Sequence, residues 1–134
     1  MKILVLNPGS TSLKLAVYED DLRFDSCTLR FDSETLQKMR EPEKRVSITL
    51  ESIRSYLASK DMKPEDFDCI ISRGGVLGKV KTGAYEINEK MVSYVKNSGN
   101  ITHSVGVILA YELAHPIGRP CYIYDAVSAD EWDP

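Results

Sequence analysis

Residues 1–19 read MKILVLNPGSTSLKLAVYE, and this segment predicts two antiparallel strands joined by a tight turn. The run Ile3–Leu6 is apolar without interruption, which is typical of a strand covered on both faces. Apolar residues then alternate with more polar ones from Leu13 to Val17, as in a half-buried strand. The intervening Asn-Pro-Gly-Ser-Thr sequence is rich in turn-forming residues. We therefore expect a hairpin whose first strand reaches Asn7.

The expected turn also has the chemistry of a phosphate site. It gathers small side chains, hydroxyl groups and backbone N–H groups in one place, and such concave loops hold anions without steric crowding. An ordinary turn with no ligand is the alternative. The candidate phosphate-binding residues are Asn7, Gly9, Ser10, Thr11, Ser12 and Lys14.

Length and charge limit the remaining possibilities. A chain of 134 residues, 43% of them hydrophobic, fits one domain with its own core. Seventeen Lys and Arg against twenty Asp and Glu give a net charge of -3, with no basic tract to follow a phosphate backbone, so nucleic acid is not expected as a partner. No apolar run is long enough for a signal peptide or a bilayer span, so we expect no membrane partner and a cytoplasmic location.

The cysteines and histidines give no metal pattern. Cys27, Cys69 and Cys121 are far apart in the sequence, and each lies in an apolar, strand-like segment. We expect them to be reduced and buried. His103 and His115 have no cysteine close by, so a structural zinc site is not indicated.

The rest of the chain predicts a mixed sheet. A third strand over 22–31 shows a parity slip at Asp25 and Ser26 that indicates a bulge. The further expected elements are a helix from about 43 to 60, a strand at 67–72, a helix capped by Asn88, a helix capped by Thr102 and ending near 114, and a strand at 121–124. This order is that of a ribonuclease-H-like α/β fold with a mixed five-stranded sheet. Such a fold brings Asn7, Arg73 and Asp125 together, because each ends one of three adjacent strands.

Four segments of the sequence resemble the amino-terminal domain of the butyrate kinases, which belong with the acetate kinases in the superfamily of actin-like, Hsp70-like and sugar-kinase folds. These segments are ILVLNPGSTSLK at 3–14, ISRGG at 71–75, GAYEINEKM at 83–91 and IYDAVSADE at 123–131. The resemblance implies a short-chain fatty acid kinase that transfers the γ-phosphoryl group of ATP to a carboxylate. ATP, Mg²⁺ and a small carboxylic acid are the implied ligands.

The resemblance also implies roles for individual residues. Asn7 and Asp125 would hold Mg²⁺, Arg73 would bind the acceptor carboxylate, and His103 would face the phosphoryl group in transfer. Residue by residue, simpler interpretations stay open: Lys14 as a solvated charge, Arg73 as half of a surface ion pair, Asp125 as a strand-end turn residue and His103 as a helix-start residue.

The members of this family continue into a second domain, which carries the adenosine pocket. Residues 1–134 therefore correspond to one ribonuclease-H-like domain of a two-domain kinase, and we expect weak activity or none from these residues alone. Two other functions remain: an acetate kinase, and a fragment that binds a phosphate or a partner without catalysis. Because such domains often dimerise, the resemblance also implies a homodimer.

Overall fold

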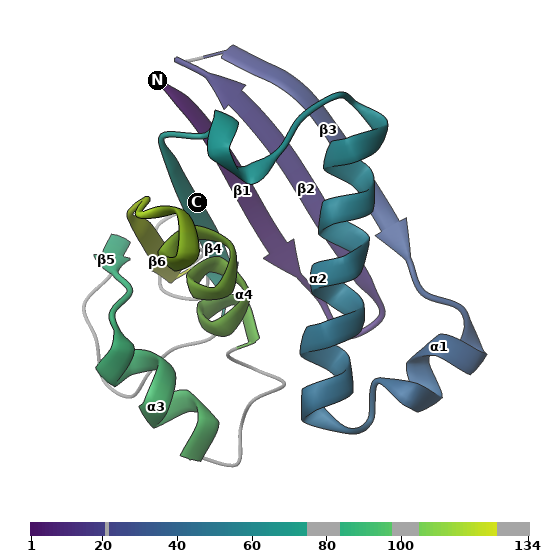
Figure 1. Ribbon diagram of the computed structural model, residues 1–134. Coiled ribbons are helices and arrows are strands. Elements are labelled where there is room, and N and C mark those ends of the chain that lie inside the picture. Colours follow the sequence, from purple (N-terminus) through teal and green to yellow (C-terminus); the bar gives the residue numbers. More distant parts are fainter. Residues whose placement is uncertain (21, 75–83, 98–104, 126–134) are drawn as a thin grey trace, which may run out of the picture.

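The computed structural model describes residues 1–20, 22–74, 84–97 and 105–125, and, for Gly74, Ala84 and Asp125, the backbone only. Along the chain lie β1 (Lys2–Pro8), β2 (Ser12–Glu19), β3 (Leu22–Arg30), α1 (Ser33–Lys38), α2 (Pro42–Ser59), η1 (Pro64–Asp66), β4 (Cys69–Gly74), β5 (Ala84–Glu86), α3 (Glu89–Asn97), α4 (Val105–Ala114), η2 (His115–Ile117) and β6 (Cys121–Asp125). Figure 1 shows one layer of helices packed on one layer of strands.

The strands form a single mixed sheet in the order β3-β2-β1-β4-β6-β5. β1 pairs antiparallel with β2 and parallel with β4, and β4 pairs parallel with β6. The predicted α/β class and mixed sheet are confirmed. The predicted count of five strands is too low, because the three-residue strand Ala84–Glu86 adds antiparallel to β6 at the edge of the sheet.

The β1–β2 hairpin is regular, with pairs running from Lys2 and Glu19 to Pro8 and Leu13. The bulge expected at Asp25 and Ser26 lies one residue earlier. Val17 pairs with Asp25 and Tyr18 pairs with Arg23, so the extra residue of β3 is Phe24.

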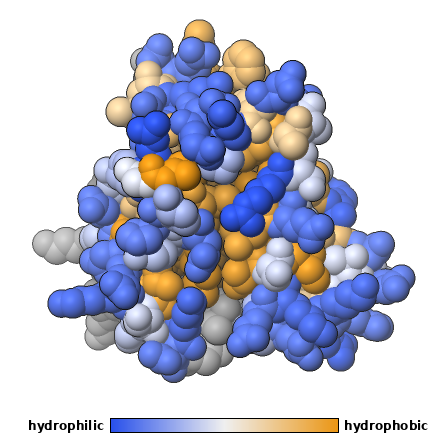
Figure 2. Space-filling view, viewed as in Figure 1, coloured by the Kyte–Doolittle hydropathy of each residue, from blue (hydrophilic) through white to orange (hydrophobic). Residues whose placement is uncertain are grey.

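Helices cover one face of the sheet (Figure 1). α2 begins with Pro42 in its first turn and buries Ile53 and Leu57, while α4 is buried along most of its length, as its apolar sequence predicts. α1, only six residues long, was not predicted. Figure 2, seen from the helix side, shows apolar surface in the gap between α2 and α4 with hydrophilic residues around it. None of the helices in the described ranges is long and apolar enough to cross a membrane.

Two of the predicted helix caps can be compared with the structure. Asn88 caps α3 as expected, since its Oδ1 accepts a hydrogen bond from the Met91 N–H at 2.9 Å. Thr102 lies outside the described residues. All three cysteine thiols are free, as predicted, and Cys69 and Cys121 are buried, whereas Cys27 was expected to be buried and is half-buried.

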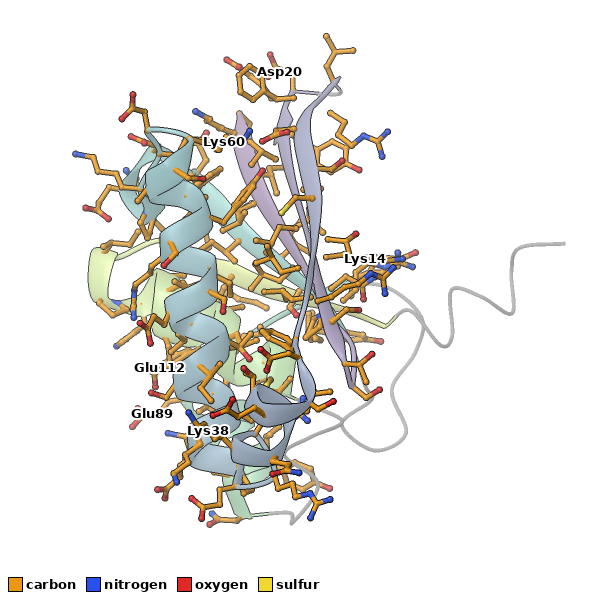
Figure 3. The ribbon with its side chains drawn as sticks, turned by 90° about the vertical axis from the view of Figure 1, so that its right-hand side faces the viewer. Lys14, Asp20, Lys38, Lys60, Glu89 and Glu112 are labelled. Atoms are coloured by element: carbon orange, nitrogen blue, oxygen red, sulfur yellow. The ribbon has the colours of Figure 1, made fainter. Side chains whose placement is uncertain are left out.

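The opposite face of the sheet has no helix over it in the described part of the chain. Leu4 and Leu6 of β1 are fully buried beneath the helices, whereas Ile3, Val5 and Asn7 alternate with them and are half-buried on the other face. Seen along the edge of the sheet, Lys14 extends away from α2 (Figure 3). The uninterrupted apolar run in β1 had predicted cover on both faces; the described elements supply it on one.

Candidate functional site

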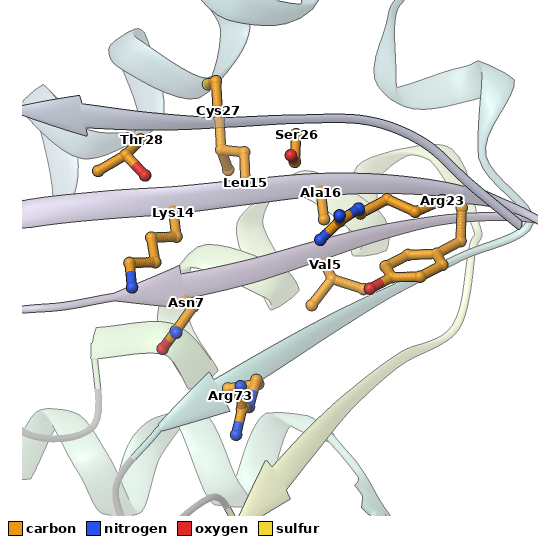
Figure 4. Close-up of a pocket in the computed structure, with 11 residues that line it drawn as sticks. Val5, Asn7, Lys14, Leu15, Ala16, Arg23, Ser26, Cys27, Thr28 and Arg73 are labelled. Carbon is orange, nitrogen blue, oxygen red and sulfur yellow. The ribbon is translucent and has the colours of Figure 1, made fainter.

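Three of the predicted site residues lie together on this uncovered face. Asn7 of β1, Lys14 of β2 and Arg73 of β4 line one hollow with a volume of about 520 Å³. Asn7 and Lys14 are cross-strand partners, and Arg73 directly follows Ser72, the residue of β4 that pairs with Leu6. Figure 4 shows the three side chains on neighbouring strands.

Strand alternation explains why these side chains share a face. Leu13 and Leu15, on either side of Lys14, are each 1% exposed and point into the core. Leu6 and Ser72, which precede Asn7 and Arg73, are both fully buried. Since successive strand residues point to opposite faces, each polar side chain emerges on the uncovered side.

The hollow is electrostatically one-sided. Lys14, Arg73 and Arg23 line it, and no aspartate or glutamate is among its described lining residues. Within the described part of the chain, none of these three cations forms a salt bridge or a side-chain hydrogen bond. Unpaired cations around a concave surface attract anions, and a guanidinium suits carboxylate and phosphate groups in particular.

Arg23 was missed by the sequence analysis. Because β3 is bulged at Phe24, simple alternation along the strand does not predict which face of the sheet the Arg23 side chain lies on. The pairing of Arg23 with Tyr18 places this side chain on the uncovered face. Ser26 and Thr28 of β3 also line the hollow. Figure 4 shows Arg23 extending across β2 near Ala16. The only sequence signal was the parity slip itself.

One backbone N–H of the hairpin turn that was predicted to bind phosphate has a partner within the turn. The Gly9 N–H donates to the Ser12 carbonyl at 2.8 Å, so this N–H is used within the turn. The Thr11 carbonyl accepts from the Phe31 N–H at 3.1 Å, and the Ser10 carbonyl faces the Arg45 guanidinium at 3.5 Å. Residues 9–12 are not among those lining the hollow. The hydroxyl groups of Ser10, Thr11 and Ser12 stay candidates for binding phosphate, whereas the Gly9 N–H already has a partner.

The other two predicted residues are less fully described. The backbone of Asp125 ends β6 and pairs with Gly74, next to Arg73, so the expected meeting of three strand ends is confirmed at the level of the backbone. His103 lies outside the described residues. Gly106 of α4 lies against Ser72 and Arg73, which places the first turn of that helix at the same end of β4.

A magnesium ion alone does not fit the described lining. Its described side-chain oxygens are neutral amide and hydroxyl groups, such as those of Asn7 and Ser26, and its three cations repel a bare metal ion. The described residues contain no cluster of three or more His, Cys, Asp or Glu side chains that could hold a metal. The arrangement suits a metal that is bound together with phosphate oxygens, which supply negative charge and further ligands.

A second polar cluster lies on the helix side of β3. The Tyr56 hydroxyl donates to Asp25 Oδ2 at 2.5 Å, and Lys60 Nζ lies 3.8 Å from the same oxygen. The hydrogen bond from Tyr56 holds the pKa of Asp25 below its ordinary value, while desolvation raises the pKa of Tyr56. This cluster ties α2 to the edge strand of the sheet and lies away from the cationic side chains of the hollow.

Sequence comparison relates the chain to proteins named butyrate kinase. It is 35% identical over 132 residues to a probable butyrate kinase of Thermotoga petrophila and to probable butyrate kinase 1 of Thermotoga maritima, covering 97% of this chain and 37% of each relative. It is 34% identical over 134 residues to probable butyrate kinase 2 of Caldanaerobacter subterraneus. The chain thus spans less than two fifths of the relatives it matches. No protein-family model matches it.

Solved structures show the same fold. A propionate kinase from Francisella tularensis superposes with a TM-score of 0.58 at 15% identity, covering 95% of this chain and 37% of that one. An acetate kinase from Porphyromonas gingivalis gives a TM-score of 0.59 at 16% identity over the same shares. At these identities the likeness shows the fold alone.

Proposed function

We propose that this chain forms one half of the active site of a short-chain fatty acid kinase. The chain is homologous to part of the butyrate kinases, and this homology confirms the resemblance in its motifs. In this proposal residues 1–134 are the amino-terminal domain, and ATP and a small carboxylic acid are the substrates. The observation that carries the proposal is the hollow that Lys14, Arg73 and Asn7 line from three neighbouring strands, with no aspartate or glutamate among its described lining residues.

Arg73 is assigned to the acceptor. Its guanidinium offers a planar pair of donors that matches the two oxygens of a carboxylate, and it has no competing acid partner among the described residues. Val5 and Tyr18 line the same hollow, and together with Ile71 and Arg73 they also line a second hollow of about 440 Å³. Apolar surface beside the guanidinium suits the short alkyl chain of the acid.

Lys14 is assigned to the phosphates, as a mobile point charge across the strand from Asn7. The hydroxyl groups of Ser10, Thr11 and Ser12 would contact the phosphate oxygens from the hairpin turn. Asn7 and Asp125 would hold Mg²⁺ together with those oxygens, and the ion would neutralise charge on the transferring group. His103 would face that group from the segment before α4.

The reaction needs no proton transfer. A carboxylate oxygen bonds to the γ-phosphorus of ATP as the bond from that phosphorus to the β,γ-bridging oxygen breaks, giving an acyl phosphate and ADP. Catalysis then consists of alignment and charge neutralisation. Arg73 would fix the attacking oxygen, and Lys14 would balance charge on the phosphoryl oxygens.

The test uses butyrate and ATP with hydroxylamine trapping of the acyl phosphate, first with the 134-residue chain and then with the chain completed by the remaining part of the Thermotoga maritima relative. Arg73→Ala in the active form should lower kcat/KM for butyrate by at least a hundredfold, with Arg40→Ala on the helix side of the molecule as the matched control. Unchanged kcat/KM in Arg73→Ala would show that the assignment is wrong.

A second function, phosphate or partner binding without catalysis, is favoured by one observation: Lys14, Arg23 and Arg73 line one hollow, which attracts anions without any reaction. Sustained acyl phosphate formation by the 134-residue chain alone would exclude it. A panel of acetate, propionate and butyrate distinguishes a butyrate kinase from an acetate kinase.

A further inference from the structure

The backbone that carries Arg73 is in contact with α4 on the face of the sheet opposite its side chain. Ser72 is fully buried among the helices, and its Oγ donates a hydrogen bond to the Arg73 carbonyl at 3.2 Å. The backbone at Ser72 and Arg73 therefore has the hollow on one side and α4 on the other.

Gly106, in the first turn of α4, makes this contact possible. A Cβ at position 106 would lie 2.1 Å from Ser72 Oγ, 3.2 Å from Ser72 Cβ and 3.3 Å from the Arg73 carbonyl oxygen. The first distance is shorter than any non-bonded contact, so the backbone of α4 rests directly on the Ser72 side chain of β4. Glycine lowers the stability of a helix, and this close approach is the physical reason for having it here.

A displacement at this contact has few ways to be absorbed locally. β4 pairs with β1 on one side and β6 on the other, so its end cannot slide freely. Val105 and Val107, on either side of Gly106, are buried as well. Even when the Ser72 hydroxyl rotates aside, a Cβ at 106 stays 3.2 Å from Ser72 Cβ and 3.3 Å from the Arg73 carbonyl oxygen, so it would press on the backbone that carries Arg73 and move the guanidinium relative to Asn7.

We propose that Ser72 and Gly106 are positioning residues for Arg73. Their contact lies on the helix face of β4, and it determines the position of the guanidinium on the opposite face relative to Asn7 and Lys14. Neither residue touches the substrate. The inference rests on the proposed function only in taking Arg73 as the acceptor-binding group; the positional effect itself can be measured without any activity.

The experiment combines Gly106→Ala with a rescue variant in the 134-residue chain. Ser72→Ala removes the oxygen at 2.1 Å and leaves a Cβ contact of 3.2 Å that small movements relieve. The NMR signal of the Arg73 Nε–H reports the guanidinium environment directly. We expect this signal to shift in Gly106→Ala and to return toward the wild-type position in Ser72→Ala/Gly106→Ala. Butyrate titration should show weaker binding in the single variant, on the order of tenfold, and recovery in the double variant.

Leu113→Ala is the matched control, because Leu113 is also buried in α4 but lies about two turns further along the helix. It should destabilise the fold while leaving the Arg73 signal in place. If Gly106→Ala does not fold, Ser72→Cys applies a milder push from the strand side, because its sulfur is larger than the oxygen it replaces, and should shift the same signal.

The two hypotheses fail in different ways. An unshifted Arg73 signal in folded Gly106→Ala or Ser72→Cys, or a shift that Ser72→Ala does not reverse, overturns the positioning role. If instead the signal shifts and is rescued, while Arg73→Ala leaves butyrate turnover intact in the active form, the positioning role stands and the proposed function of Arg73 is wrong.

Discussion

Replacing Lys14 with alanine should weaken the binding of inorganic phosphate to the hollow. Lys14 lines the hollow from β2, is exposed, and forms no ion pair within the described part of the chain. Its charge is therefore available to an incoming anion. The substitution should leave the fold intact, because neighbouring residues of β2 rather than Lys14 fill the core.

The size of the effect follows from the exposure of the site. Two unit charges 4 Å apart attract by about 4 kcal/mol at an effective dielectric constant of 20 and by about 1 kcal/mol in bulk water. The hollow is open to solvent on the uncovered face, so the lower end applies. A loss of about 1 kcal/mol corresponds to a roughly fivefold higher Kd at low salt, and the difference should shrink as ionic strength rises because salt screens exposed charges.

The assay is a phosphate titration followed by NMR at two salt concentrations, with Lys38→Ala as the control. Lys38 ends α1 and lies well away from Lys14 in the edge-on view, so its removal changes the net charge equally without touching the hollow (Figure 3). Phosphate affinities that fall equally in the two variants would mean that only the overall charge matters. Affinity unchanged in Lys14→Ala would refute the assignment of the hollow to anions.

Three further predictions concern the fold. Leu6→Ala should lower the free energy of unfolding by about 3 kcal/mol, since the side chain is fully buried beneath the helices and its loss leaves a cavity; urea denaturation measures this. Asn88→Ala should cost about 1 kcal/mol through the lost cap of α3, measured in the same way, and Asn88→Asp should retain most of the stability. At pH values above 3.8, the ordinary carboxyl pKa of Asp25, Tyr56→Phe should have a lower free energy of unfolding than wild type. The free energies of the two proteins should converge as pH falls. The reason is that a lowered folded pKa stabilises the ionised state, and this contribution disappears when pH drops through the folded value; a stability gap independent of pH would contradict the role of the carboxylate.

Much of the fold could be predicted because its signals are local. The hairpin of β1 and β2 follows from apolar alternation around a turn, and α2 follows from apolar residues at helical spacing. β5 and α1 were missed, since three and six residues are too short to show a period. The bulge was displaced by one residue, because a parity slip does not say which residue is left unpaired.

The candidate site divides in the same way. Asn7 and Arg73 could be placed at strand ends from the sequence, because polar residues directly follow buried strands there. Arg23 could not, because pairing across the sheet decides which way its bulged strand faces.

By itself, the sequence determined which of the longer segments become strands and helices, and that Asn7, Arg73 and Asp125 lie within one residue of the ends of three of those strands, because side-chain periodicity and turn chemistry act over a few residues. Only the tertiary structure decided that the described helices lie on one face, that Lys14, Arg23 and Arg73 surround a hollow on the other, and that Gly106 must lack a side chain where α4 meets Ser72. These features depend on contacts between residues far apart in the chain, and no local pattern encodes such distances.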